Sequence, residues 1–424
     1  MARPLVFTSL LIGVLGLFVG CLPGDQTPEA GTAANAAPGL ATESADAPPA
    51  GASITDDYRQ GTPVIGETLS MAPYLAPLTH EGNTTHDVRI DTLAVEATAG
   101  PGIYYTAWTF GGSVPGPILH VREGDRIRYT GTNRSDEPIH PASQFRNNPE
   151  SSPFARRAGD LDPVEAMPAL APAAHAIDFH AATVAPDRTW LSWAPGETIR
   201  LEWTARYPGV FTYHNSMPSR TMNTGLGMHG VVVVSPREGY PTDEEVARSY
   251  VIVRSELYLA EAARASAQND TDEDPAGATS SDTDENTGSA TPANTGGPST
   301  YRWDHAAAMA GTPSQVVLNG RANLLHDYPL VASRGDRIRL FVINQGPVQI
   351  STFHITGIVF DRIWLGGVPA NELRGLQSVT LAPSESAVVE FVVPADGEYT
   401  LLFGRMSDEN RGADGTLVVQ TGQS

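Results

Sequence analysis

Lysine is missing from this chain of 424 residues, so all 27 basic residues are arginine. The absence excludes chemistry that needs a lysine amine, such as a Schiff base or the phosphate contact of a P-loop. Acidic residues outnumber basic ones and give a net charge of −21. Because binding to a nucleic-acid backbone needs clustered positive charge, we expect no nucleic-acid partner. Genomic composition is the simplest explanation for the missing lysine.

Cysteine is nearly absent as well, since Cys21 is the only one. It follows Arg3 and an apolar stretch over residues 5–20, which is shorter than a membrane span of about 20 residues. This pattern predicts a secretion signal over residues 1–21. The string Phe18–Cys21 resembles a bacterial lipobox, which predicts lipidation of Cys21 and a periplasmic or cell-surface lipoprotein anchored to the membrane. The alternative is an ordinary signal peptide with a chance cysteine.

Large apolar side chains are scarce in two segments. Residues 22–62 are rich in Ala, Pro, Gly, Thr and acidic residues, and we interpret them as a disordered tether. Residues 265–300 contain no Leu, Ile, Val or aromatic residue and seven acidic ones. Such a segment buries too little apolar surface to repay its ordering entropy, so we expect a disordered acidic insertion.

Between these segments, short apolar runs alternate with polar residues at a period of two. Ile199, Leu201 and Trp203 form one such run, and residues 338–342 form another. Gly, Pro, Asn and Asp separate the runs, as in the strands of a β-sandwich. The pattern predicts an all-β protein with half-buried strands. Amphipathic helix is indicated only over residues 244–248 and 257–264.

The chain also repeats itself in order, which predicts a tandem duplication of one β-domain. GDRIR occurs at residues 124–128 and again at 335–339, and APxE occurs at 194–197 and 382–385. Phe-His occurs at 179–180 and 353–354. We therefore expect a first domain over residues 63–240 and a second over 241–424. A shorter offset at the Phe-His pair places an insertion loop at residues 137–172 of the first copy.

The chain has 11 histidines, and most of them have an ordinary explanation. Loop-like surroundings predict that five are solvated, and two more lie in strand-like runs without an evident partner. The solvated five are His80, His86, His140, His305 and His326, and the other two are His120 and His229.

Strand parity sorts the residues around the remaining histidines into two groups. Side chains an odd number of residues apart point to opposite faces of a strand. Asp178 and His180 therefore share a face that His175 does not, and His214 and Asn215 also point in opposite directions. If the two strands are neighbours, two sites arise back to back. A lone strand histidine is usually hydrogen-bonded, but a set of three favours a metal.

Several motifs together resemble the copper-containing nitrite reductases, which are two-domain cupredoxins of the multicopper oxidase group. The resemblance covers residues 63–419 apart from the two insertions. It implies two tandem cupredoxin-like Greek-key β-sandwich domains. The motifs that carry it are Trp108–Gly112, His175–Thr183, Pro208–His214, Ser235–Gly239, Val317–Gly320 and Ser351–His354.

In this family, three histidines hold a type 2 copper with an open position for water or nitrite. His180 and His214 match two of the ligands, and His354 matches the third, which the family supplies from a neighbouring subunit. The resemblance therefore implies a homotrimer. Asp178 matches the acid that hydrogen-bonds the substrate and delivers a proton, and Gln315 stands where the family has a second catalytic histidine.

The second copper site of the family is not matched. Blue type 1 copper needs a thiolate, two histidines and a weak axial methionine. Asn215 stands at the cysteine position, and Asn223 or Thr224 at the second histidine, so only His175 and Met228 match. We therefore expect one type 2 copper, no blue copper, and an electron supplied by an external donor.

Three functions remain open at this stage. The first is an exported copper enzyme that reduces nitrite to nitric oxide or handles another small oxygen species. The second is a non-enzymatic copper-binding or scaffold cupredoxin trimer at the cell surface. The third is a metal-free β-sandwich interaction module.

Overall fold

The computed structural model describes residues 74–137, 140–141, 173–185, 191–261 and 300–420. The predicted signal, Cys21 and the tether lie outside these ranges, as do most of the two predicted insertions. Most of the regular structure in the described part is strand, with three short α-helices, namely α3 (Arg220–Gly225), α4 (His305–Ala310) and α5 (Leu324–Asp327), and one 3-10 helix, η3 (Met406–Arg411). None of the described helices has the length and apolarity needed to cross a membrane.

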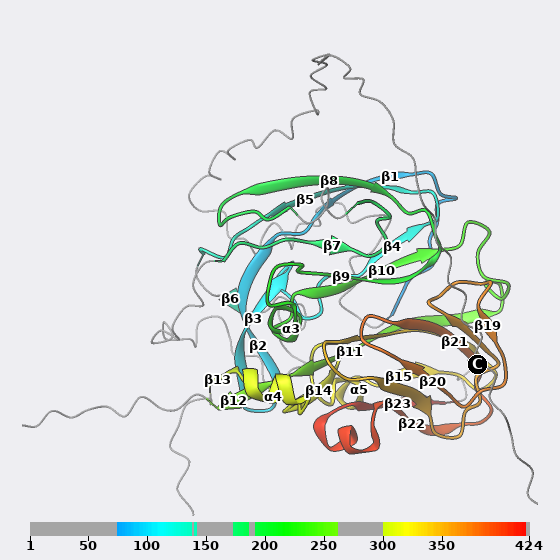
Figure 1. The fold of residues 1–424 in the computed structure, drawn as a ribbon. Helices are drawn as coiled ribbons and strands as arrows, with labels where there is room; N and C mark the ends of the chain where they lie inside the picture. Colours follow the sequence, from blue (N-terminus) through cyan, green and yellow to red (C-terminus); the bar gives the residue numbers. More distant parts are fainter. Residues whose placement is uncertain (1–73, 138–139, 142–172, 186–190, 262–299, 421–424) are drawn as a thin grey trace, which may run out of the picture. The chain divides into compact units, whose positions relative to one another are not determined.

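Two sheets of the first repeat enclose one core (Figure 1). The core gathers buried aliphatic and aromatic side chains, including Phe179, Trp203 and Tyr213. One sheet has the order β1 (Thr85–Arg89), β5 (Arg126–Thr132), β8 (Thr198–Thr204). The other has the order β4 (Leu119–Arg122), β10 (His229–Ser235), β9 (Gly209–His214), β7 (Asp178–Phe179).

The second repeat forms a larger sandwich around a core that includes Phe353, Phe360 and Phe391. Its two sheets have six and five strands. The first runs β14 (Gln315–Leu318), β11 (Val246–Leu257), β16 (Arg337–Gly346), β21 (Ser386–Val392), β18 (Arg362–Leu365), β19 (Glu372–Leu373). The second runs β15 (Leu330–Ala332), β23 (Asp414–Val419), β22 (Gly397–Gly404), β17 (Ser351–Ile355), β20 (Ser378–Leu381).

A fifth sheet contains strands from both repeats. In it, β13 (Thr300–Trp303) of the second repeat pairs in parallel with β3 (Ile103–Phe110) of the first, with Thr300 opposite Tyr104. The sheet has the order β12 (Leu259–Glu261), β13, β3, β2 (Thr92–Gly100), β6 (His140–Pro141). Two of the described residues of the predicted 137–172 insertion, His140 and Pro141, therefore extend this sheet as β6.

The repeated sequence motifs form matching turns. The backbone N–H of Ala194 donates to the Glu197 carboxylate at 2.7 Å, and that of Ala382 donates to Glu385 at 2.9 Å. In the GDRIR repeats, Gly124 and Gly335 have φ of +97° and +88°, a conformation that glycine adopts without a Cβ penalty. The same short sequences thus give the same local structure in both copies, as a duplication predicts.

The expectation of half-buried strands holds for β8 but is wrong for β16. In β8, Leu201 and Trp203 are buried while Arg200 and Glu202 are exposed. In β16, the residues after Arg337 are all buried, because Leu340 faces the second core while Phe341 packs in a cluster with strands of the first repeat. The helical expectation for residues 244–248 and 257–264 is also wrong, since β11 and β12 include residues of both stretches.

Candidate metal centre

Antiparallel pairing of β7 with β9 brings one group of predicted site residues together. Asp178 lies opposite His214, and the backbone N–H of His180 continues the ladder by donating to Thr212. The Nε2 atoms of His180 and His214 are 3.1 Å apart. Asp178 Oδ2 is 3.6 Å from the first of these nitrogens and 3.8 Å from the second.

Hydrogen bonding and burial prepare both imidazoles to act as ligands. His214 Nδ1 lies 3.0 Å from the backbone oxygen of Asn215, so this nitrogen carries the proton and leaves the Nε2 lone pair free. Burial lowers the pKa of His180, and the neighbouring His214 lowers it further, while Asp178 opposes both effects. A lowered pKa keeps His180 neutral, which is the form that binds a metal.

The geometry of this group fits a transition-metal ion. Two imidazole nitrogens that each lie about 2.0–2.1 Å from one ion are separated by about 3 Å, and the observed separation is 3.1 Å. Asp178 stands beside the pair, within reach of a small molecule bound there. Two imidazoles leave coordination positions for a third ligand and for an exchangeable molecule.

The other two predicted site residues do not join this group within one chain. In the described part of the chain, the group of possible ligands around His180 consists of Asp178, His180 and His214, whose ligand atoms lie within 4.8 Å of one another. His354 lies on β17 of the second repeat and is half-buried. Gln315 begins β14 and pairs with Leu257. A third ligand from the second repeat would therefore have to come from another copy.

On the opposite side of the same strand end, Asn215 is buried among the residues of the predicted second group. Its amide nitrogen lies 3.0 Å from His175 Nδ1 and 3.1 Å from Met228 Sδ. Its amide oxygen accepts the backbone N–H groups of Ala176 and Met217. The asparagine therefore uses all of its hydrogen-bonding capacity within this pocket.

This second pocket does not fit a blue copper. The pocket contains no thiolate. The Asn215 amide hydrogen-bonds to the ring nitrogen of His175 and to the sulfur of Met228, which would be two of the copper ligands. Burial lowers the pKa of His175 to about 4, so its ring stays neutral and accepts the amide hydrogen. Asn223, one of the two residues predicted at the position of the second histidine, donates to the Met217 carbonyl at 3.0 Å.

Comparison with known proteins shows what this chain is similar to. The chain is 29% identical over 363 residues to a copper-containing nitrite reductase of Neisseria meningitidis serogroup B, covering 84% of this chain and 75% of the relative. It is 27% identical over 308 residues to a copper-containing nitrite reductase of Pseudomonas chlororaphis, covering 71% and 69%. Over most of its length, the chain is therefore similar to copper-containing nitrite reductases. No model of a protein family matches the chain.

Solved structures show the same fold. A copper nitrite reductase from Nitrosomonas europaea aligns with a TM-score of 0.57 at 24% identity, covering 80% of this chain and 94% of the other. A multicopper oxidase aligns with a TM-score of 0.55 at 18% identity, covering 79% and 89%. These likenesses confirm the all-β architecture of cupredoxin domains.

Sequence reasoning missed one cluster of titratable side chains. The prediction that His86 is solvated is wrong, because the residue is 6% exposed and contacts the buried Asp125 together with His80. The three residues are up to 45 positions apart, so no local pattern joins them. The signal that could have found the cluster is Asp125 itself, an acidic residue inside the GDRIR repeat.

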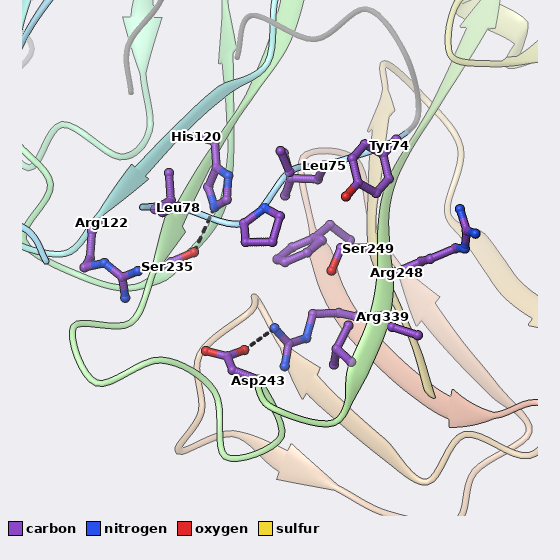
Figure 2. Close-up of a pocket in the computed structure, with 15 residues that line it drawn as sticks. Tyr74, Leu75, Leu78, His120, Arg122, Ser235, Asp243, Arg248, Ser249 and Arg339 are labelled. Atoms are coloured by element: carbon purple, nitrogen blue, oxygen red, sulfur yellow. Dashed lines mark hydrogen bonds and ion pairs between the residues drawn. The ribbon is translucent and has the colours of Figure 1, made fainter. Parts of the chain in front are cut away.

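The two strand histidines without an evident partner do have partners. His120 Nε2 lies 2.9 Å from the Ser235 hydroxyl, and His229 Nδ1 lies 3.1 Å from the Thr224 carbonyl. His120 lines a cavity of about 220 Å³ beside the segment Tyr74–Leu78 (Figure 2). None of Asp178, His180 and His214 lines this cavity, so it is separate from the metal centre.

Proposed function

We propose that this chain is an exported copper oxidoreductase that reduces nitrite to nitric oxide at a single type 2 copper. Support comes from the convergence of His180 and His214 beside Asp178, with a nitrogen separation of 3.1 Å that suits two ligands of one ion. The family relatives carry the name copper-containing nitrite reductase. His354 of a neighbouring copy supplies the third ligand, so the working form is a homotrimer.

Each residue of this centre has a distinct task. His180, His214 and the neighbouring copy's His354 hold the ion, and the fixed tautomer of His214 directs Nε2 toward it. Asp178 binds the substrate oxygen and delivers a proton. Bound copper supplies the one-electron chemistry. The reaction consumes one nitrite, one electron and two protons, and it yields one nitric oxide and one water.

The electron reaches this centre from an external donor, because the chain has no blue copper. Asn215 stands at the cysteine position, and its amide holds His175 and Met228. The chain's only cysteine is Cys21, at the predicted lipid anchor. Turnover with ordinary blue-copper or cytochrome donors is therefore slow, while a small chemical reductant bypasses the missing site.

Nitrite turnover with a chemical reductant tests this function. The copper-loaded protein is expected to form nitric oxide, and His180→Ala is expected to abolish it. Asp178→Asn keeps the size of the side chain but removes the proton donor, so we expect retained copper and a rate lowered by about 10²–10⁴-fold. Equal turnover in wild type and His180→Ala would overturn the assignment.

The second candidate is a non-enzymatic, surface-anchored copper-binding or scaffold trimer. Asn215 favours it, because the pocket on that face is filled by hydrogen bonds. Gln315 favours it as well, since an amide does not titrate near neutral pH. Under this alternative, copper binds with the same dependence on His180, but nitrite is not consumed with any donor.

A further inference from the structure

A second cluster of possible metal ligands lies in the first sandwich and shares no residue with the copper centre. It consists of His80 ahead of β1, His86 in β1, and Asp125 in the turn between β4 and β5. One ligand atom of each residue lies within 4.8 Å of the other two. The strand pairing of β1 with β5 holds the turn beside the histidines, with His86 opposite Ile127.

Both imidazoles converge on one oxygen atom. The Nε2 atoms of His80 and His86 lie 2.6 Å and 3.0 Å from Asp125 Oδ2. The two rings meet edge to face, with centroids 5.1 Å apart. Asp125 is fully buried and His86 is 5% exposed at its side chain, while His80 keeps 18% exposed. The partly exposed His80 gives an ion a route from solvent.

The hydrogen bonds of this cluster are shared unevenly between the two carboxylate oxygens of Asp125. Asp125 Oδ2 contacts the two imidazoles and also accepts the backbone N–H of Arg122 at 2.8 Å. Within the described part of the chain, Oδ1 accepts one hydrogen bond, from the backbone N–H of Thr84 at 2.9 Å. A carboxylate oxygen offers about two lone-pair sites, so three donors on one oxygen are crowded while the other oxygen has capacity left. An ion on the imidazole lone pairs would relieve this crowding.

The carboxylate is also held in the ionised, oriented form that ligation requires. Burial alone would raise the pKa of Asp125, but hydrogen bonds from His86, Arg122, His80 and Thr84 outweigh it and lower the pKa below its usual value. The backbone at His80 is fixed by Arg122 Nε, which donates to its carbonyl at 2.9 Å. Such supporting contacts orient ligands in metal sites.

We propose that His80, His86 and Asp125 bind a divalent zinc or copper ion as a second metal site. Two imidazole nitrogens and one carboxylate oxygen form a donor set that zinc and copper accept, whereas magnesium and calcium prefer oxygen donors alone. Coordination spreads the ligand atoms by about a few tenths of an ångström, and on each neutral ring the proton that faces Oδ2 shifts to Nδ1, which leaves the Nε2 lone pair for the ion. Water completes the coordination on the exposed side of His80.

This site ties the segment before β1 to the first sandwich. His80 lies outside the strand, and within the described part its side chain is joined to the sandwich through Asp125. An ion bound by residues up to 45 positions apart stabilises the folded state, because the unfolded chain does not hold the ligands together. We therefore assign it a structural role distinct from catalysis.

Zinc titration of the metal-stripped full-length protein tests the proposal, with a competing chelator to count the sites. Wild type is expected to bind two ions per chain, one here and one at the copper centre. His80→Ala and His180→Ala are each expected to lose one ion, and the double variant both. The matched control is His326→Ala, since His326 contacts Asp414 at 2.8 Å and, among the described residues, belongs to neither group of possible ligands. This control is expected to keep both ions.

The outcomes distinguish failure of this second site from failure of the copper centre. Unchanged stoichiometry in His80→Ala would overturn the second site, whatever His180→Ala does. Loss of an ion in His80→Ala alone, with none lost in His180→Ala, would support this site and contradict the copper centre. His80→Gln keeps a hydrogen-bond donor for Asp125. If this variant melts like metal-free wild type, but zinc raises its melting temperature by less than that of wild type, lost binding at this site rather than lost folding explains the missing ion.

Discussion

Asn215 is the residue on which the account of the second pocket depends. Its four hydrogen-bonding positions meet a ring nitrogen, a thioether and two backbone N–H groups. The sequence predicted the two back-to-back groups from strand parity, because a period of two is a local property. It did not predict that the asparagine amide would join His175 to Met228, since that depends on the loop after β9.

Replacing Asn215 by alanine is expected to lower the free energy of unfolding by about 2–4 kcal/mol, because two buried backbone N–H groups lose their acceptor. Denaturant unfolding measures the change. The matched control is Asn371→Ala, an exposed asparagine with one long amide hydrogen bond, for which we expect a change within about 0.5 kcal/mol. Equal effects of the two substitutions would show that the buried network contributes little.

Buried neutral histidines predict how stability depends on pH. Burial lowers the pKa of His120 to about 3 and those of His175 and His229 to about 4. An unfolded histidine takes up its proton near pH 6.5, so below that pH the unfolded state binds protons that the folded state excludes. We expect stability to be constant above about pH 6.5 and to fall by up to about 1.4 kcal/mol per pH unit for each group below it. Unfolding curves between pH 7.5 and about 4.5 measure this slope, and a flat profile would contradict the burial of these rings.

At the scale of elements, β16 shows that an alternating sequence pattern does not reveal whether one face or both faces of a strand are buried. Its alternating pattern is shared with β8, but β16 lies between two clusters of apolar side chains while β8 has one solvent-exposed face. Which face is covered depends on strands far away in sequence. The GDRIR and APxE turns could be predicted, because their glycine and carboxylate act on residues one to three positions away.

Substitutions on both faces of β16 are therefore expected to be costly. Leu340→Ala and Phe341→Ala should each lower the free energy of unfolding by about 2–5 kcal/mol, because each leaves a cavity in a buried cluster. The half-buried strand β8 provides the contrast. Leu201→Ala should cost a similar amount, whereas Glu202→Ala, whose ion pair with Arg126 is exposed, should cost about 0–1 kcal/mol. A negligible effect of Phe341→Ala would contradict burial of the second face.

At the scale of the whole molecule, the three proposed ligands do not come together within the described part of one chain. His180 and His214 come together through the β7–β9 pairing, while His354 lies in the other sandwich. The sequence could predict the first two because they sit on neighbouring strands of one domain. The role of His354 came only from the family resemblance, since strand periodicity says nothing about contacts between copies.

Subunit mixing tests whether the ligands come from different copies. His180→Ala and His354→Ala are each expected to lack the centre when pure. Co-expressed in equal amounts, they should recover about one quarter of wild-type sites, because a random symmetric assembly pairs the two intact halves at that frequency. Copper bound by trimers that carry both variants measures this. A centre built within one chain would show no recovery.

The most direct test of a single type 2 copper is to record the absorption and electron-spin spectra of the copper-loaded protein. His80→Ala is the suitable background, because it removes the second proposed site. We expect about one copper per chain, a type 2 electron-spin signal, no intense blue absorption band, and loss of the signal on adding His180→Ala. An intense blue band, or copper that remains fully bound in His180→Ala, would contradict the proposed single type 2 copper.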